Sequence, residues 1–126
     1  MRYLGVDWGI KKIGVAISEG DLATPLKTLH VNGLEDAISQ IVGCCEDEIA
    51  DLIVLGKPEG EMGEIVKKVS KLLKGEGFEV VLADETLSTQ EAQSLMIEMG
   101  LGKKDRKDDN ATSAAIILQR YLDEKH

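Results

Sequence analysis

Acidic side chains stand at three places where this chain passes from one predicted element to the next. Asp7 closes an apolar run near the N-terminus, Glu85 follows a later apolar run, and Asp109 opens a final helical pattern. Carboxylates held close together repel one another unless a cation neutralises them. Their hard oxygen atoms suit Mg²⁺ or Mn²⁺, and such a cluster supports metal-assisted hydrolysis of phosphodiesters.

Each of these acids also has a purely structural explanation. Asp7 could accept backbone N–H groups in its own turn, and Glu85 could be an exposed residue after a strand. Asp109 could cap a helix N-terminus, where negative charge is favourable. Only a topology that brings all three to one edge favours a metal site over these explanations.

The N-terminal part of the chain has the pattern of a small antiparallel sheet. Apolar and alternating runs predict strands over 2–7, 12–18 and 23–31, close enough in sequence for a meander. Pro25 cannot donate a ladder hydrogen bond and therefore places the third strand at an edge. Apolar residues at helical spacing then predict a helix over 34–45.

The rest of the chain alternates strand and helix patterns. Strands are predicted over 51–55 and 78–83, and helices over 62–73 and 109–122. A further helix is predicted to begin at Ser88, which opens an S-x-x-E capping box. A polar loop covers 100–107. A meander followed by β-α-β crossovers predicts one α/β domain over 1–126, with a five-stranded mixed sheet flanked by helices. The carboxyl ends of strands one, four and five then meet where open α/β sheets bind ligands.

Composition limits the classes of function. The chain has 126 residues, of which 43% are hydrophobic and 30% charged, as in ordinary globular proteins. No apolar run approaches the roughly 20 residues of a membrane span, and no secretory signal precedes the first strand, so we expect a cytoplasmic protein without a membrane partner. The adjacent Cys44 and Cys45 lack further soft ligands and fit core and helix-surface positions in a reducing compartment.

The charge balance does not favour general binding to nucleic acid. The formal net charge is −8, whereas domains that grip phosphate backbones are usually basic or carry a basic stripe. Basic residues gather in two places, within 67–74 and within 103–107. Any nucleic-acid role therefore has to use a local patch or metal ions.

Four stretches of the chain, in order, resemble motifs of the YqgF/RuvX family, known as pre-16S rRNA nucleases and as Holliday junction resolvase-like proteins. They are LGVDWGIKKIGVAIS (4–18), LIVLGKPEGEMG (52–63), DETLSTQEA (84–92) and AAIILQRYLDE (114–124). The match covers nearly the whole chain. It implies an RNase H-like fold, as in RuvC-type nucleases, and hydrolysis of phosphodiester bonds that depends on Mg²⁺ or Mn²⁺.

The resemblance also implies roles for individual acids. Asp7 matches the first metal-binding acid of the family, and Glu85 matches the acid after the fifth strand. In the register of the C-terminal motif the family's helix aspartate falls on Asn110, one residue after Asp109. One helical step rotates a side chain by about 100°. Either Asp109 supplies the charge through a slightly shifted helix start, which we expect, or the affinity for metal is weakened. Asn110 can offer a neutral oxygen to the metal in both cases.

Basic residues near these motifs are candidate phosphate contacts. Lys12 replaces the arginine of the family's opening motif, and Lys57 belongs to its G-x-P motif. The loop before the last helix could guide a nucleic-acid backbone into the site through Lys103, Lys104, Arg106 and Lys107. Trp8 could stack on a base or pack against its own loop. Besides Asn110, which is the most serious departure from the family pattern, Thr86 replaces an arginine and the segment after Pro58 is shorter than usual.

Four functions follow from these observations. The leading one is a metal-dependent nuclease that acts on structured RNA in maturation of the 16S rRNA 5′ end. The alternatives are a Holliday junction resolvase for branched DNA and a non-catalytic RNA-binding or ribosome-assembly module with a degenerate site. The opening motif is also similar to the first phosphate loop of actin-like ATPases and sugar kinases. The sequence has no obvious dimer helix, so we expect a monomer or weak dimer.

Overall fold

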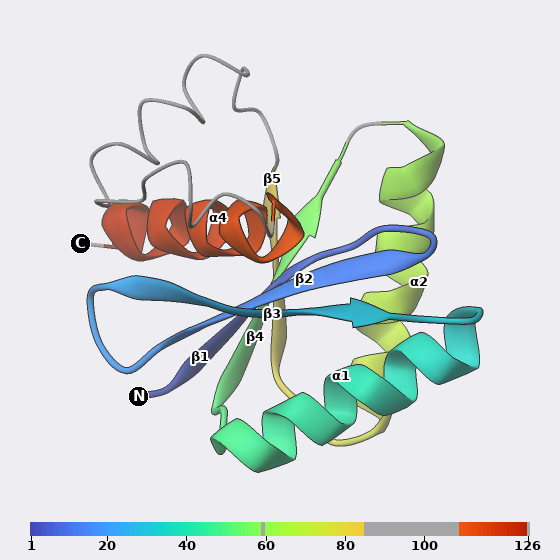
Figure 1. Ribbon diagram of the computed structural model, residues 1–126, viewed down its shortest axis with the longest axis horizontal. Helices are drawn as coiled ribbons and strands as arrows, with labels where there is room; N and C mark the ends of the chain where they lie inside the picture. The colour runs from blue at the N-terminus through green and yellow to red at the C-terminus, as the bar shows by residue number, and fades with distance from the viewer. Residues whose placement is uncertain (59, 85–108, 126) are drawn as a thin grey trace.

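The computed structural model describes residues 1–58, 60–84 and 109–125, and Figure 1 shows their arrangement. In chain order the elements are β1 (Tyr3–Asp7), β2 (Lys12–Ser18), β3 (Ala23–His30), α1 (Leu34–Glu48), β4 (Leu52–Lys57), α2 (Glu61–Gly75), β5 (Val80–Asp84) and α4 (Asp109–Lys125). The helix predicted from Ser88 and the loop predicted over 100–107 lie outside the described residues.

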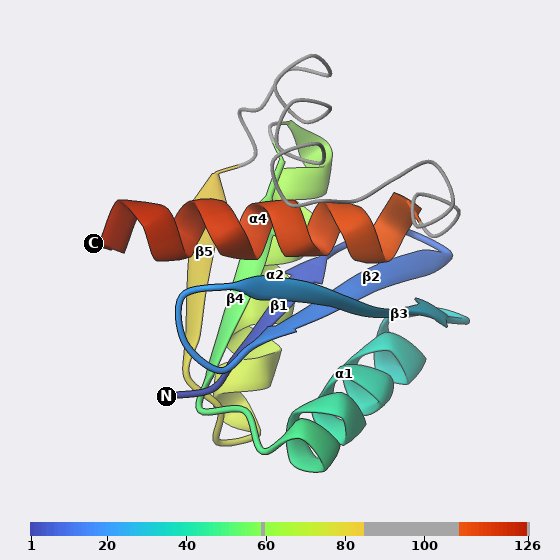
Figure 2. The same cartoon turned by 60° about the vertical axis from the view of Figure 1, so that its left-hand side comes forward.

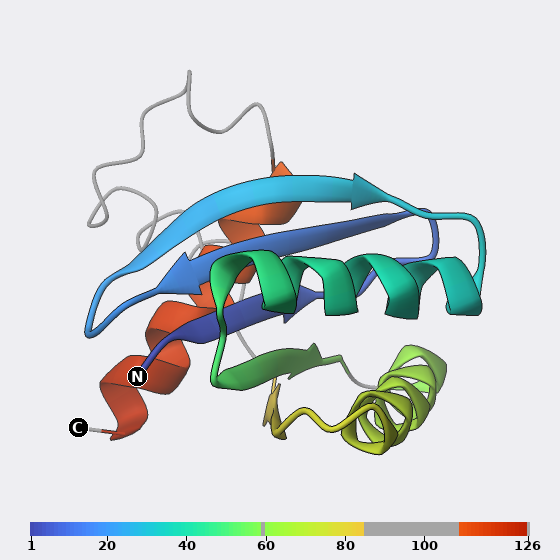
Figure 3. The same cartoon turned by 90° about the horizontal axis from the view of Figure 1, so that it is seen from below.

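The strands form one mixed sheet with the predicted topology. Their order is β3-β2-β1-β4-β5, with β1 and β3 antiparallel to β2 and with β4 parallel to both β1 and β5. Figure 3 shows this order edge to edge. The meander therefore supplies one half of the sheet and the crossovers the other, and β1 lies at the centre as expected. Pro25 lies on the edge strand β3, next to a register shift opposite Val15 and Ala16.

Helices cover both faces of the sheet, which gives three layers and two hydrophobic cores. Figures 1 and 2 show α4 crossing the strands on one face, with α1 and α2 on the other. Side chains of β1 alternate between the cores: Leu4 and Val6 pack with α1 and α2, whereas Tyr3 packs with α4. No described helix is both long and apolar enough to cross a membrane.

Most element boundaries differ from the predicted ones by one to three residues, and three of these differences have identifiable local causes. The strand predicted over 78–83 begins only at Val80, because Phe78 donates its N–H to the carbonyl of Leu73 and so completes the end of α2. The strand predicted to end at Leu55 continues to Lys57, which pairs with Asp84 on β5. Helix α4 runs past Leu122 to Lys125, whose ammonium group donates a hydrogen bond to the Tyr3 hydroxyl at 2.7 Å.

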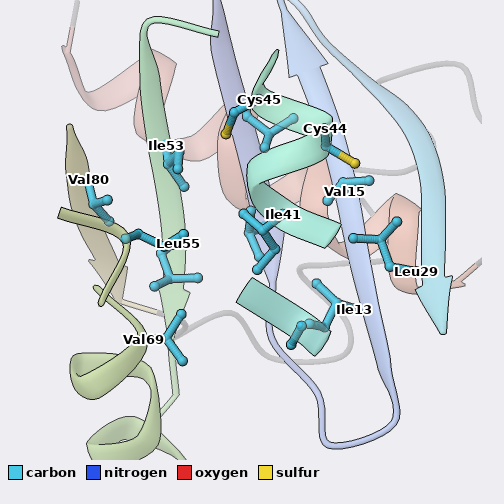
Figure 4. Close-up of a cluster of buried hydrophobic side chains, with 14 of the residues drawn as sticks. Ile13, Val15, Leu29, Ile41, Cys44, Cys45, Ile53, Leu55, Val69 and Val80 are labelled. Atoms are coloured by element: carbon cyan, nitrogen blue, oxygen red, sulfur yellow. The ribbon is translucent and has the colours of Figure 1, made fainter. Parts of the chain in front are cut away.

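Both cysteines of α1 are buried in the core, whereas the sequence predicted core and helix-surface positions for this pair. Figure 4 shows Cys44 and Cys45 with Ile41 on the helix surface that packs over β1 and β2. Burial is the main cause that raises the pKa of both thiols, to about 12 for Cys45. A raised pKa keeps the thiol protonated, so neither cysteine has the thiolate character of a reactive site or a metal ligand.

The C-terminus of α1 carries backbone strain that a substitution can relieve. Ile49 follows the helix with φ of 52° and donates its N–H to the carbonyl of Glu46, while its side chain is 73% exposed. Branched residues are unfavourable in this left-handed conformation, which glycine adopts readily. We expect Ile49→Gly to raise the free energy of unfolding by about 1 kcal/mol.

Urea unfolding at equilibrium measures this change, and Ile10→Gly is the matched control. Ile10 is 70% exposed but does not have a positive φ. The same substitution should therefore leave stability unchanged or lower it at residue 10. An equal gain at both positions would show that loss of exposed apolar surface, not relief of strain, is the cause.

Candidate active site

Asp7 is the last residue of β1 and belongs to the sheet face that α4 covers. Side chains alternate along a strand, and Tyr3 and Gly5 both contact α4, so Asp7 follows them on that face. Its side chain is half-buried. In the ladder with β2, Asp7 lies directly opposite Gly14. Asp7 thus combines a fixed strand position with partial access to solvent.

Gly14 brings the first turn of α4 onto this part of the sheet. A Cβ atom at residue 14 would overlap the backbone carbonyl oxygen of Asn110, so only glycine permits the contact. One turn further along, a Cβ at Gly5 would lie 2.8 Å from Cβ of Leu118 and 3.0 Å from the carbonyl oxygen of Ala114. Two glycines on neighbouring strands therefore set how closely the helix approaches, and they place its N-terminus beside Asp7.

The same contacts define which residue of α4 faces the sheet at this point. Asn110, Ala114 and Leu118 follow one another at intervals of four and form one stripe of the helix. Asn110 is half-buried at the start of this stripe, over Gly14. The structure therefore brings Asp7 and Asn110 together from two elements that are far apart in sequence. Asp109 is the first residue of α4, and its side chain lies outside the described part of the structure.

The predicted lysines lie on opposite faces of the sheet. Lys12 begins β2 and is exposed, and alternation puts it on the face of Gly14, beside the candidate site. Lys57 follows Leu55 by two residues and belongs to the other face, with its Cε 3.7 Å from the Cβ position of Gly63 on α2. Lys12 therefore shares a face with Asp7 and Lys57 does not. Trp8 is half-buried and packs against the core under α1 and α2, so it packs on the sheet and not on the neighbouring loop that the sequence suggested.

The remaining predicted site residues cannot be placed. Glu85, Lys103, Lys104, Arg106 and Lys107 lie outside the described residues. Within residues 1–58, 60–84 and 109–125, no three His, Cys, Asp or Glu side chains gather closely enough to hold a metal ion. Asp7 and Asn110, which belong to β1 and α4, the two elements that meet at Gly14, have side chains with hard oxygen atoms of the kind that Mg²⁺ and Mn²⁺ prefer.

Sequence reasoning missed the glycines that assemble the site. Gly5 and Gly14 lie inside predicted strands, where glycine weakens the strand and often marks close approach of another backbone. Alternation along the strands puts both glycines on the same face as Asp7, and this pattern could have predicted that another element packs closely there. The helix that approaches them is about a hundred residues away in sequence, and no local pattern identifies it.

Comparison with known proteins identifies the family. A family model described as "RuvX: Holliday junction resolvase" matches residues 1–124. The chain belongs to the RuvX family. Among curated RuvX relatives, a protein of Dictyoglomus thermophilum is 37% identical over 133 residues, which covers 98% of this chain and 96% of that protein. A relative from Clostridium tetani is 40% identical over 133 residues, with the same coverage. Both bear the name "Putative pre-16S rRNA nuclease".

Solved structures confirm the RNase H-like fold expected of a RuvX protein. Thermus thermophilus RuvC in complex with a Holliday junction substrate matches with a TM-score of 0.68 at 16% identity, over 99% of this chain and 95% of that chain. The fowlpox virus Holliday junction resolvase matches with a TM-score of 0.70 at 14% identity, over the full length of both chains. Family and fold together place this RuvX protein among hydrolytic nucleases, as the sequence predicted.

The glycine contact can be tested by adding a single methyl group. We expect Gly14→Ala to lower the free energy of unfolding by about 2–4 kcal/mol, because α4 must move away from β2. Gly43 on α1 has no atom within 4 Å of its Cβ position and provides the control. Gly43→Ala should instead raise stability by up to about 1 kcal/mol, since alanine is the better helix former.

Urea unfolding of both variants checks this prediction. If Gly14→Ala were as stable as the unchanged protein, the close approach of α4 to β2 would not constrain the structure.

Proposed function

We propose that this chain is a divalent-metal-dependent endonuclease that hydrolyses phosphodiester bonds of structured RNA in 16S rRNA 5′-end maturation. The observation that carries the proposal is the convergence of Asp7, at the end of the central strand, with the N-terminus of α4 in a RuvX-family chain. The names of the relatives support ribosomal RNA precursor as the substrate. We infer a cytoplasmic site of action from the same substrate.

Four residues are proposed to hold the metal. Asp7 lies across the ladder from Gly14, on which the backbone of Asn110 in the first turn of α4 packs. Glu85 is added by its position in the family motif, and Asp109 is added as the acid one residue before the motif position that Asn110 occupies. When bound, Mg²⁺ or Mn²⁺ supplies an activated water and stabilises the charge that develops on the scissile phosphate. The Asp7 carboxylate provides a fixed negative charge on a rigid strand, so its position needs little reorganisation during the reaction.

Lys12 is proposed to bind the phosphate next to the scissile bond. Lys12 is exposed on the face that carries Asp7. The turn that precedes it is tight, since a Cβ atom at Gly9 would overlap the carbonyl oxygen of Lys12. The N-terminus of α4 adds the positive end of a helix dipole to the same place. Together they offset the repulsion between the acids of the site and an anionic substrate.

A second candidate is resolution of branched DNA. The family description and the match to RuvC bound to a Holliday junction favour it. Resolution needs two coordinated cuts and hence two active sites, so a stable dimer in solution would support this function. The proposed monomer or weak dimer favours RNA instead.

Two further alternatives make different predictions. A nucleotide-binding module should bind ATP, and the likeness to the Thermus thermophilus ROK hexokinase, with a TM-score of 0.50 over 38% of that chain at 19% identity, concerns the fold alone. A non-catalytic RNA-binding module should bind RNA without cutting it. A cleavage assay separates both from the proposed nuclease.

We expect Asp7→Asn to reduce cleavage of a structured 16S precursor RNA at least about a hundredfold in Mg²⁺ or Mn²⁺, since loss of one preorganised charge commonly costs that much. The assay compares this RNA with a four-way DNA junction. Asn110→Asp should increase cleavage or lower the metal concentration needed for half-maximal rate, because it adds a charge beside Asp7.

RNA binding in the absence of divalent metal, measured by fluorescence anisotropy, is the control for folding of these variants. Equal cleavage by Asp7→Asn and the unchanged protein would refute the proposed metal site. Cleavage of the DNA junction alone, by a dimeric protein, would establish the resolvase instead.

The proposed phosphate contact of Lys12 gives a separate test. Lys12→Gln should raise KM for RNA several-fold and lower the slope of log affinity against log salt by roughly one. Lys27, exposed on the edge strand β3, provides a control with the same change of charge. If Lys12→Gln and Lys27→Gln lower affinity equally, the effect of Lys12 is one of net charge and not of a contact.

A further inference from the structure

Helix α2 carries a concentrated row of lysines on its solvent face. Its buried side consists of Gly63, Val66, Val69, Ser70 and Leu73, which pack toward the sheet. On the opposite side, the exposed residues between 67 and 74 are Lys67, Lys68, Lys71, Lys74 and Leu72. The only acidic partner among the described contacts of this row is Glu64, one turn earlier, with its Oε1 3.4 Å from Nζ of Lys67. We call these four lysines the α2 row.

The charge of the α2 row contrasts with that of the whole chain. The chain has 15 basic and 23 acidic residues, yet four of the basic residues occupy eight consecutive positions of one helix. Both side chains of the ion pair between Lys67 and Glu64 are exposed to solvent, and exposed ion pairs of this type are weak and screened by salt. The positive charge is therefore concentrated within residues 67–74, between the exposed Glu61 and Glu64 before the row and the exposed Glu76 and Glu79 after it.

Helix electrostatics explain only part of this arrangement. Cations stabilise the last turn of a helix, and Lys74 is the one lysine that occupies it. Lys67, Lys68 and Lys71 lie in the middle of the helix, where the dipole gives them no advantage. Solubility also gives no reason for cations in particular, since acidic residues already provide a net charge of −8.

The geometry of the row fits a phosphate backbone. Lys67, Lys71 and Lys74 lie within one narrow stripe, separated along the helix axis by about 6 Å and about 4.5 Å at 1.5 Å per residue. Such spacing lets three flexible ammonium groups follow successive phosphates of one strand. A flat anionic membrane is a poorer fit, because the acidic surface beside the row would face it as well, whereas a single RNA strand can contact the row alone.

The position of α2 connects the row to the candidate site. The helix begins directly after β4, whose carboxyl end lies at the same edge of the sheet as Asp7, because β1 and β4 are parallel. From that edge α2 runs along the face opposite α4, as Figures 1 and 2 show. A base-paired stem that enters the site at this edge can continue over α2, so the row contacts substrate remote from the cleaved bond.

We propose that the α2 row is a second nucleic-acid contact surface that binds the phosphate backbone of a double-stranded RNA stem without reading its sequence. The inference rests on the proposed function, since it takes structured RNA as the substrate. The α2 row then anchors the RNA stem on the opposite side of the sheet, while the candidate site at the end of β1 binds the RNA strand that is cleaved.

The test measures binding without cleavage. A fluorescein-labelled RNA stem is titrated by anisotropy in EDTA, at several salt concentrations, with the unchanged protein and with the variant K67Q/K71Q/K74Q. The variant should bind roughly tenfold more weakly near 0.1 M salt, and the slope of log affinity against log salt should fall by about two to three. The loss should be equal for stems of unrelated sequence, since phosphate contacts carry no base information.

Single substitutions provide the matched control. Lys71→Gln and Lys27→Gln remove the same charge from exposed positions, and only the former belongs to the row. Lys71→Gln should lower the salt slope by about one, whereas Lys27→Gln should leave it unchanged. Equal effects of these two substitutions, or an unchanged slope in the triple variant, would overturn the proposal.

The other outcomes are also decisive. Binding of the unchanged protein to phosphatidylserine vesicles, with none to the RNA stem, would assign the row to a membrane surface and refute the RNA contact. Because no divalent metal is present, the result does not depend on catalysis. A row that binds RNA in a protein that fails to cleave it would leave this inference standing and refute the proposed nuclease.

Discussion

The contact between the first turn of α4 and the strands beneath it is the constraint on which the candidate site depends. Gly14 and Gly5 let the helix backbone approach to van der Waals distance, and Asp7 lies directly across the ladder from Gly14. The site is therefore assembled by backbone packing before any metal or substrate is involved. A side chain as small as methyl at residue 14 removes the space that the helix occupies, because closely packed interiors have little capacity to adjust.

The sheet also separates two electrostatic tasks. The face under α4 carries Asp7 and Lys12, and the solvent side of α2, on the opposite face, carries the row of lysines proposed to bind the backbone. The packed sheet keeps the α2 row apart from Asp7, so the charges of the row and of the candidate site do not pair with one another. Two faces separated by a packed sheet allow an acidic protein to bind a polyanion locally, while the net charge of −8 opposes non-specific association elsewhere.

Much of this architecture is predictable from the sequence, and the failures have definite physical causes. Alternation and apolar runs located all five strands, because each needs one or two buried faces. Phe78 was placed in a strand because it is apolar, although its N–H completes the end of α2. The face of Lys57 could have been derived by counting from Leu55, whereas the approach of α4 to Gly14 depends on a contact between distant segments. Such contacts have no local signature.

The glycine contacts bear most directly on the third acidic position of the family. The backbone carbonyl of Asn110 lies against Gly14, and Ala114 and Leu118 lie against Gly5, so the helix is held at two successive points along one stripe. Rotation or sliding of α4 would break both contacts together. The phase of the helix is thus set by β1 and β2, not by the residue that occupies position 110. Movement of α4 would cost the packing of the whole face, so it is an unfavourable way to bring a different residue to the site. The charge of the site therefore depends on which residues occupy positions 109 and 110.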